Sequence, residues 1–152
     1  MKKFISVIII SLASFAMINA QEHAFMKGTN AINVGIGVSS YFNPSFAISA
    51  SYERGIYTFA DKFTIGAEAA INIAPVKQVA FEASLGPTFH YCPNERFDIY
   101  AGPTIFFYTV GSFSRVGALG RLGVRYLFTN HIGVFANLGG IGLANAGVVF
   151  RF

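Results

Sequence analysis

The chain has 152 residues, of which 53% are hydrophobic, 16% aromatic and only 12% charged, with a net charge of +4. A water-facing domain usually carries about a quarter charged residues, so this composition is unlike that of a fully solvated surface. The small positive excess is not gathered into a Lys/Arg cluster, which argues against a nucleic-acid partner, and the length allows one domain.

The first 20 residues have the pattern of a removable secretion signal. Lys2 and Lys3 precede an apolar stretch over 4–18, and Ala20 ends a sequence typical of a cleavage site. Cleavage after Ala16 is the alternative. The apolar stretch has 15 residues, fewer than the about 20 that a membrane-spanning helix needs. We therefore expect a signal peptide over 1–20 and one mature domain over 21–152.

Eight segments with apolar residues at alternate positions follow, and this period of two indicates β-strands. They cover residues 32–39, 46–53, 63–73, 79–91, 97–108, 115–128, 132–139 and 144–152. Pro87 and Pro103 fall inside two of them, where each removes a donor from the strand ladder. Those two strands should either carry bulges or have other boundaries.

The charged residues of these segments share the polar face: Glu53, Glu68, Glu82, Asp98, Arg115, Arg121, Arg125 and Arg151. A soluble sandwich or barrel would show many Lys and Glu on that face. Here acids and arginines alternate with Gly and Ser, which suits a narrow lumen with paired charges. We expect a lumen charge network in which Glu53, Glu68, Glu82 and Asp98 pair with Arg121, Arg125 and Arg151. The sequence leaves open which acid meets which arginine.

A sheet with an apolar outer face in a bilayer must close on itself, because an open edge would leave backbone groups unpaired in hydrocarbon. Eight strands of about 9–11 residues suffice to close a ring and cross the membrane. The sequence therefore predicts an all-β fold, an eight-stranded antiparallel up-and-down transmembrane β-barrel. Eight strands leave an interior just wide enough for side chains, so we expect a filled lumen.

The end of the chain carries a further pattern. Asn145, Gly147, Phe150 and Phe152 resemble the C-terminal assembly signal of Gram-negative outer-membrane barrels, with a polar residue, a glycine and two aromatics at the matching spacing. This resemblance implies that the barrel-assembly machinery recognises the last strand during insertion.

Several motifs in order also resemble the small outer-membrane β-barrel domain family, related in shape to OmpA/OmpX-type barrels: residues 51–55, 61–66, 89–91, 96–102, 120–126 and 132–136. The resemblance implies an eight-stranded up-and-down barrel with both termini in the periplasm. We expect a monomer in the cell outer membrane, surrounded by lipid. The resemblance places connections near 41–44, 74–77, 110–114 and 138–141 outside the cell. The connections near 54–60, 92–96 and 129–131 would then face the periplasm.

Function follows less directly from these patterns. A structural or envelope-maintenance role fits a filled barrel with short loops. One alternative is a lipid A-modifying barrel enzyme, in which His90 on the lumen face would act with Ser84 and Asp98. Another is a periplasmic lipocalin-like barrel, which would bind an apolar ligand inside.

Other chemistry has little support in the sequence. Cys92 is the single cysteine and lies in a predicted turn, with His90 as its one nearby base. The three histidines, His23, His90 and His131, are far apart in sequence, so we expect no metal site and no cofactor.

Overall fold

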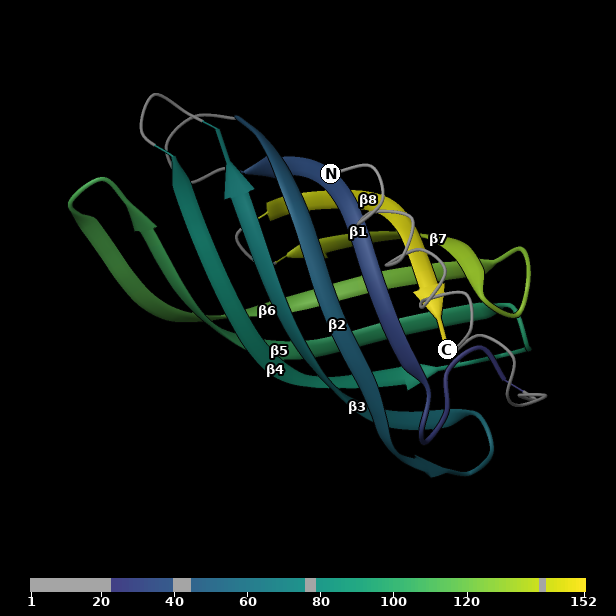
Figure 1. Cartoon of the computed structure of the whole chain (residues 1–152). Coiled ribbons are helices and arrows are strands. Elements are labelled where there is room, and N and C mark those ends of the chain that lie inside the picture. The colour runs from purple at the N-terminus through teal and green to yellow at the C-terminus, as the bar shows by residue number, and fades with distance from the viewer. Residues whose placement is uncertain (1–22, 40–44, 76–78, 140–141) are drawn as a thin grey trace, which may run out of the picture.

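The chain folds into a closed barrel of eight antiparallel strands, as the computed structural model in Figure 1 shows for residues 23–39, 45–75, 79–139 and 142–152. The strands are β1 (Asn30–Ser39), β2 (Ser45–Phe59), β3 (Phe63–Ala74), β4 (Ala80–Tyr91), β5 (Phe97–Val110), β6 (Phe113–Leu127), β7 (Ile132–Gly139) and β8 (Gly142–Arg151). Each pairs with its chain neighbour, and β1 pairs with β8 to close the ring. The predicted fold class is confirmed.

Four expectations concern residues wholly or partly outside these ranges. The signal peptide over 1–20, with both of its candidate cleavage positions, is one of them, and the connection at 41–44 is another. The connections near 74–77 and 138–141 lie partly outside. No helix in the described part of the chain is long and apolar enough to cross a membrane.

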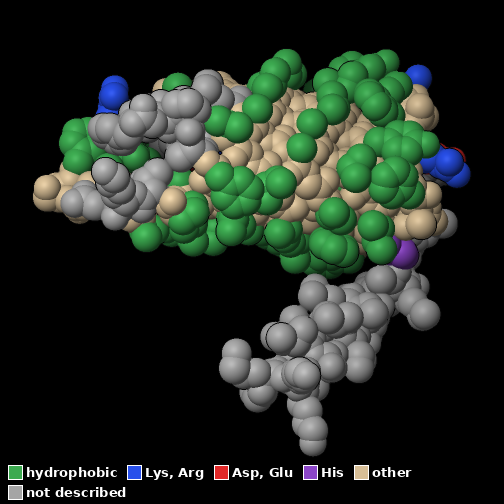
Figure 2. All heavy atoms as spheres, turned by 90° about the horizontal axis from the view of Figure 1, so that it is seen from above, with side chains coloured by type: hydrophobic (Ala, Val, Ile, Leu, Met, Phe, Trp, Pro, Cys, Tyr) green, Lys and Arg blue, Asp and Glu red, His purple; other side chains and the backbone are tan. Residues whose placement is uncertain are grey.

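The outer wall of the barrel is apolar and its lumen is polar. Outward side chains such as Ile36, Leu85 and Ile105 are 58%, 63% and 65% exposed, whereas the lumen residues Glu53 and Asp98 are 0% and 1% exposed. Figure 2 shows hydrophobic side chains spread over the wall and basic ones at its ends. Such a wall is stable only against hydrocarbon, and it is the reverse of a lipocalin-like barrel with an apolar interior.

Strand β2 is longer than the sequence predicts. The expected turn over 54–60 is wrong for most of its length, because β2 continues to Phe59 and the chain reverses only at residues 60–62. Its register shifts between Gly55 and Tyr57, and both Ile56 and Tyr57 are exposed, as a bulge requires. The bulge breaks the alternation that the sequence reading relied on.

Because β2 is longer than predicted, it includes one charged residue whose side chain faces outward, toward lipid. Arg54 follows Tyr52 on this outer face and is exposed, close to the end of the barrel. A long basic side chain can reach toward water from such a position. Arg54 lies level with Asn30, the first residue of β1, and exposed apolar side chains of β2 continue beyond it.

The two strand prolines lie opposite each other. Leu85 pairs with Ile105 and Phe89 with Ala101 in one unshifted register, which places Pro87 across from Pro103 in the gap between these pairs. Proline has no backbone N–H, so neither residue can donate a ladder hydrogen bond to the other. The ladder between β4 and β5 is interrupted there without a bulge, and both predicted strands are continuous through their proline.

Lumen aromatics account for several residues that interrupt the polar face in the sequence. Tyr100 lies across from Gly123 and Phe106 across from Gly117. A Cβ on Gly123 would meet the Tyr100 ring at 2.3 Å, and one on Gly117 would meet the Phe106 ring at 2.5 Å. These glycines make room for rings that fill the narrow lumen.

One end of the lumen is filled by a segment that the sequence reading did not assign. Residues 23–29 fold back beside β2, where Gly28 N donates to Gly55 O at 2.9 Å and Gly55 N donates to Thr29 O at 2.9 Å. The C-terminus lies at the same end, since Asn30 and Phe152 exchange two backbone hydrogen bonds. We call this the termini end and the opposite one the far end.

The β5–β6 hairpin extends past the rim at the far end. Its turn, Gly111 and Ser112, lies within the predicted 110–114 connection, but β6 begins to pair with β7 only at Arg121. Among the described residues, the earlier part of β6 pairs with β5 alone, and Arg115 on it is exposed. Figure 1 shows this hairpin as the part of the structure that reaches farthest from the ring.

Candidate functional site

The polar residues of the lumen gather in a layer between two apolar clusters. Ala24, Phe25, Leu127 and Val149 belong to the cluster at the termini end. The cluster at the far end contains Phe106 and Tyr108 with three alanines. The layer between them therefore has little contact with water, and its charges require partners.

Four charged residues form one connected group near the termini end, which we call the mouth cluster: Glu53, His90, Asp98 and Arg125. His90 Nε2 lies 2.8 Å from Glu53 Oε1, and its Nδ1 lies 3.0 Å from Asp98 Oδ1. Arg125 bonds the other oxygen of each carboxylate, through Nη2 to Glu53 and through Nη1 to Asp98 at 3.0 Å. Two carboxylates are thus each shared by the same imidazole and guanidinium.

Aromatic rings enclose the mouth cluster on both sides. His90 stacks between Phe25, at a centroid distance of 4.0 Å, and Tyr100, at 5.6 Å. The guanidinium carbon of Arg125 lies 4.2 Å from the centroid of the Tyr100 ring, within cation–π range. These planar contacts fix the orientation of the His90 ring and the Arg125 guanidinium.

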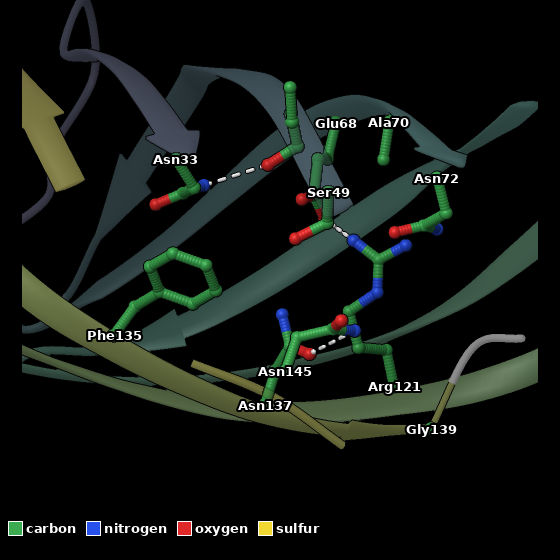
Figure 3. Close-up of a pocket in the computed structure, with 12 residues that line it drawn as sticks. Asn33, Ser49, Glu68, Ala70, Asn72, Arg121, Phe135, Asn137, Gly139 and Asn145 are labelled. Carbon is green, nitrogen blue, oxygen red and sulfur yellow. Dashed lines mark hydrogen bonds and ion pairs between the residues drawn. The ribbon is translucent and has the colours of Figure 1, made fainter. Parts of the chain in front are cut away.

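A second ion pair lies nearer the middle of the lumen. Arg121 on β6 bonds Glu68 on β3 through Nη1, and its Nη2 reaches Ser84 Oγ at 3.4 Å. Figure 3 shows Arg121 and Glu68 among the amides Asn33, Asn137 and Asn145. A cavity of about 20 Å³ remains among them, which holds about one water molecule.

Two residues of the expected network make other contacts. Glu82 accepts from Asn72 Nδ2 at 3.0 Å near the far end. Arg151 donates to backbone carbonyls: from Nη1 to His23 at 3.0 Å and Ala24 at 2.6 Å, and from Nε to Asn130 at 2.7 Å. Among the described residues, no ion pair joins Arg151 to one of the four expected acids, and its guanidinium binds the carbonyls of His23, Ala24 and Asn130 instead.

The candidate catalytic group is only partly assembled. His90 and Asp98 are bonded, but the other ring nitrogen of His90 faces Glu53 and Thr88 rather than Ser84. Ser84 instead contacts Arg121. His90 is also only 2% exposed.

Cys92 lies just past the end of β4 and is fully buried. Its Sγ donates to Phe25 O at 3.4 Å and lies 3.7 Å from Asp98 Oδ1. Burial raises the pKa of the Cys92 thiol, and the Asp98 carboxylate raises it further. Both effects oppose formation of the reactive thiolate.

No metal site is formed by the residues that the structure describes. Within them, no group of three His, Cys, Asp or Glu side chains is placed to hold an ion. The acids and His90 of the mouth cluster are bonded to each other and to Arg125 instead.

The four residues of the expected assembly signal lie in or next to β8. Phe150 faces outward and is 44% exposed, and Asn145 is buried in the lumen. Gly147 lies opposite Gly35, and a Cβ there would meet Gly35 Cα at 2.4 Å. Phe152 follows the strand and pairs with Asn30 through the backbone.

The sequence did not predict that His90 would lie at the centre of the mouth cluster, or that Phe25 and Tyr100 would stack on its ring. His90 is the one histidine at a lumen position in a described strand, and this position was the available signal. Phe25 lies before the first alternating segment, where the period of two gives no information.

The closed ring, the apolar wall and the filled polar lumen define an eight-stranded transmembrane β-barrel. Solved structures agree with this class. The N-terminal β-barrel domain of Pseudomonas aeruginosa OprF is 17% identical, with a TM-score of 0.63 over 87% of this chain and 100% of that one. The outer-membrane protein Ail of Yersinia pestis, in a nanodisc, is 12% identical, with a TM-score of 0.56 over 83% and 100%.

A de novo designed transmembrane β-barrel is also similar, at 12% identity and a TM-score of 0.59 over 83% of this chain and 97% of that one. No protein-family model and no curated protein sequence matches the chain. Its fold is that of the small OmpA/OmpX-type barrels of the Gram-negative outer membrane.

Proposed function

We propose that this chain is an integral outer-membrane protein with a structural, envelope-maintenance role, whose lumen is a rigid interior rather than a pore or an active site. The termini end faces the periplasm in this proposal. The observation that carries it is the filled polar layer, in which Arg125 links Glu53 to Asp98 and Arg121 binds Glu68 across the lumen.

Among the described residues, the lumen offers no continuous path for ions or water, which supports a structural role over that of a channel. Tyr100, Phe106 and Phe135 project into the lumen and are at most 5% exposed. The lumen cavities that border Arg121 have volumes of about 20 Å³ and about 10 Å³. Spaces of this size hold single water molecules, not a continuous water column.

The outer wall supports lipid as the surrounding partner. Rings gather near the termini end, where Phe63 stacks with Phe59 at 5.7 Å and contacts Tyr91 at 5.1 Å. Aromatic girdles of this kind lie at the membrane interfaces of outer-membrane barrels. No second chain is required to cover the wall, so the barrel is proposed to be a monomer.

Fractionation and conductance test the proposal together. The protein should be recovered with outer membranes, and its gel mobility should differ between boiled and unboiled samples, because a folded barrel resists detergent at room temperature. Purified protein should give no single-channel currents in planar bilayers. Recovery in the soluble periplasm would refute the membrane assignment, and stable unitary currents would refute the filled lumen.

A deletion strain tests the role itself. We expect increased entry of a hydrophobic dye through the outer membrane, with lipid A of unchanged acylation by mass spectrometry. A changed acyl pattern, restored by the intact gene but not by a His90→Gln variant, would support the lipid A enzyme instead.

A further inference from the structure

We propose that residues 23–29 are a latch, which docks into the termini end after β1 and β8 have paired and holds the closed barrel from inside. The latch is a segment of the same chain that binds inside the barrel, and it contains a turn of its own. Thr29 N donates to Met26 O at 3.0 Å, and Gly28 has a φ of 88°, a left-handed conformation that glycine adopts without strain.

Phe25 is the anchor of the latch. Its side chain is 2% exposed and stacks on His90 at 4.0 Å, with the Arg125 guanidinium 5.5 Å from its ring centroid. Two glycines make room for it, because a Cβ on Gly55 or on Gly66 would lie 3.3 Å from Phe25 Cε1. The ring thus covers the mouth cluster from the open end of the barrel.

Carbonyl groups of the latch are held by side chains from distant strands. Phe25 O accepts from Thr64 Oγ1 on β3 at 3.1 Å and from Cys92 Sγ after β4 at 3.4 Å. His23 O and Ala24 O both accept from Arg151 on β8. These donors come together only in a closed ring, because β3 and β8 reach the same mouth from opposite sides of β1.

The position of Arg151 connects docking to closure. Arg151 pairs with Ala31 of β1 in the β1–β8 ladder, and Arg151 N donates to His131 O on the other side. Its guanidinium therefore takes its place in the mouth when the last strand is paired on both edges. Before that event the latch lacks two of its hydrogen bonds and the wall that Leu127 and Val149 supply.

The native cysteine reports docking, because Cys92 is 0% exposed and its thiol bonds the latch itself. The purified barrel in detergent micelles is treated with a small water-soluble maleimide at pH 8, well below its unfolding temperature. We expect wild type to label slowly, and Arg151→Gln and Phe25→Ala to label at least tenfold faster with unboiled gel mobility unchanged.

Arg115→Gln is the matched control, since it removes an exposed guanidinium at the far end. It should label as slowly as wild type. Equal labelling of wild type and both latch variants would overturn the latch, because the barrel wall alone would then protect Cys92. Loss of the folded gel band in wild type would instead refute the barrel, so the two failures are distinct.

Refolding from urea tests the order of events. Samples taken during refolding are divided between an unboiled gel, which reports ring closure, and a maleimide pulse, which reports docking. Cys92 protection should appear with the folded band or after it, and Phe25→Ala should reach the folded band without protection. Protection that precedes the folded band in wild type would contradict docking after closure.

Discussion

Arg125→Ala tests the mouth cluster most directly. Arg125 is 3% exposed and bonds Glu53 and Asp98 at once, so its loss leaves two buried carboxylates with His90 as their remaining partner in the cluster. Removing one partner from a buried ion pair costs about 3–5 kcal/mol. For a domain of this size, this corresponds to a fall in melting temperature of about 10–20 °C.

The assay is thermal unfolding in detergent, followed by the loss of the unboiled gel band and by circular dichroism. Membrane insertion should be unchanged, because the apolar wall is intact. Arg115→Ala is the control for losing an arginine as such, and its melting temperature should stay within about 2 °C of wild type, since exposed substitutions change stability by about 0.5 kcal/mol at most.

A second substitution separates charge from packing. If the uncompensated charge causes the loss, Glu53→Gln added to Arg125→Ala should recover part of the melting temperature, because it removes one carboxylate charge. If the lost contact with the Tyr100 ring causes it, the double variant should be no more stable than the single one. An unchanged melting temperature in Arg125→Ala would refute the network as a source of stability.

Four further outcomes follow from single positions. Gly123→Ala should destabilise the barrel by about 1–3 kcal/mol in urea titrations, because its Cβ would lie 2.3 Å from the Tyr100 ring. Ala60→Gly should stabilise it by about 1 kcal/mol, since Ala60 has a φ of 48° in the exposed turn after β2. Phe152→Ala should reduce the amount assembled in cells, measured by blotting outer-membrane fractions, while refolding in detergent proceeds at the wild-type rate. Cys92 should label slowly in the folded barrel even at pH 9, where an exposed thiol is mostly thiolate. Its raised pKa keeps the thiol protonated at that pH. Rapid labelling at pH 9 would contradict its burial.

The strands were predictable because lipid and lumen impose opposite requirements on alternate residues. Ile132–Gly139 was predicted with its observed bounds, and β3, β4 and β5 were predicted to within a residue or two at each end. The exceptions have local causes. The bulge between Gly55 and Tyr57 places two outward residues in succession, and an alternation rule reads this as the end of a strand.

The network was predictable as a set of lumen positions but not as a set of pairs. The alternation predicts that Glu68 and Arg121 both face the lumen. It does not predict that Glu68 on β3 and Arg121 on β6 lie at the same level along the barrel axis. That information lies in the stagger of the strands, which the sequence pattern does not encode. The role of Arg151 depended on residues 23–29, whose irregular backbone has no period.

The last three residues of the chain each make a different kind of contact. Phe150 faces the hydrocarbon, Arg151 faces the lumen, and the backbone of Phe152 pairs with Asn30. In the expected recognition by the assembly machinery, the last strand must be accessible until it is released, so its inward face cannot already be covered. The latch satisfies this order, because its binding surface includes Arg151 and so exists only after release. In the two proposals together, the alternation that turns Phe150 outward for recognition also turns Arg151 inward, where it binds the latch once the barrel has closed.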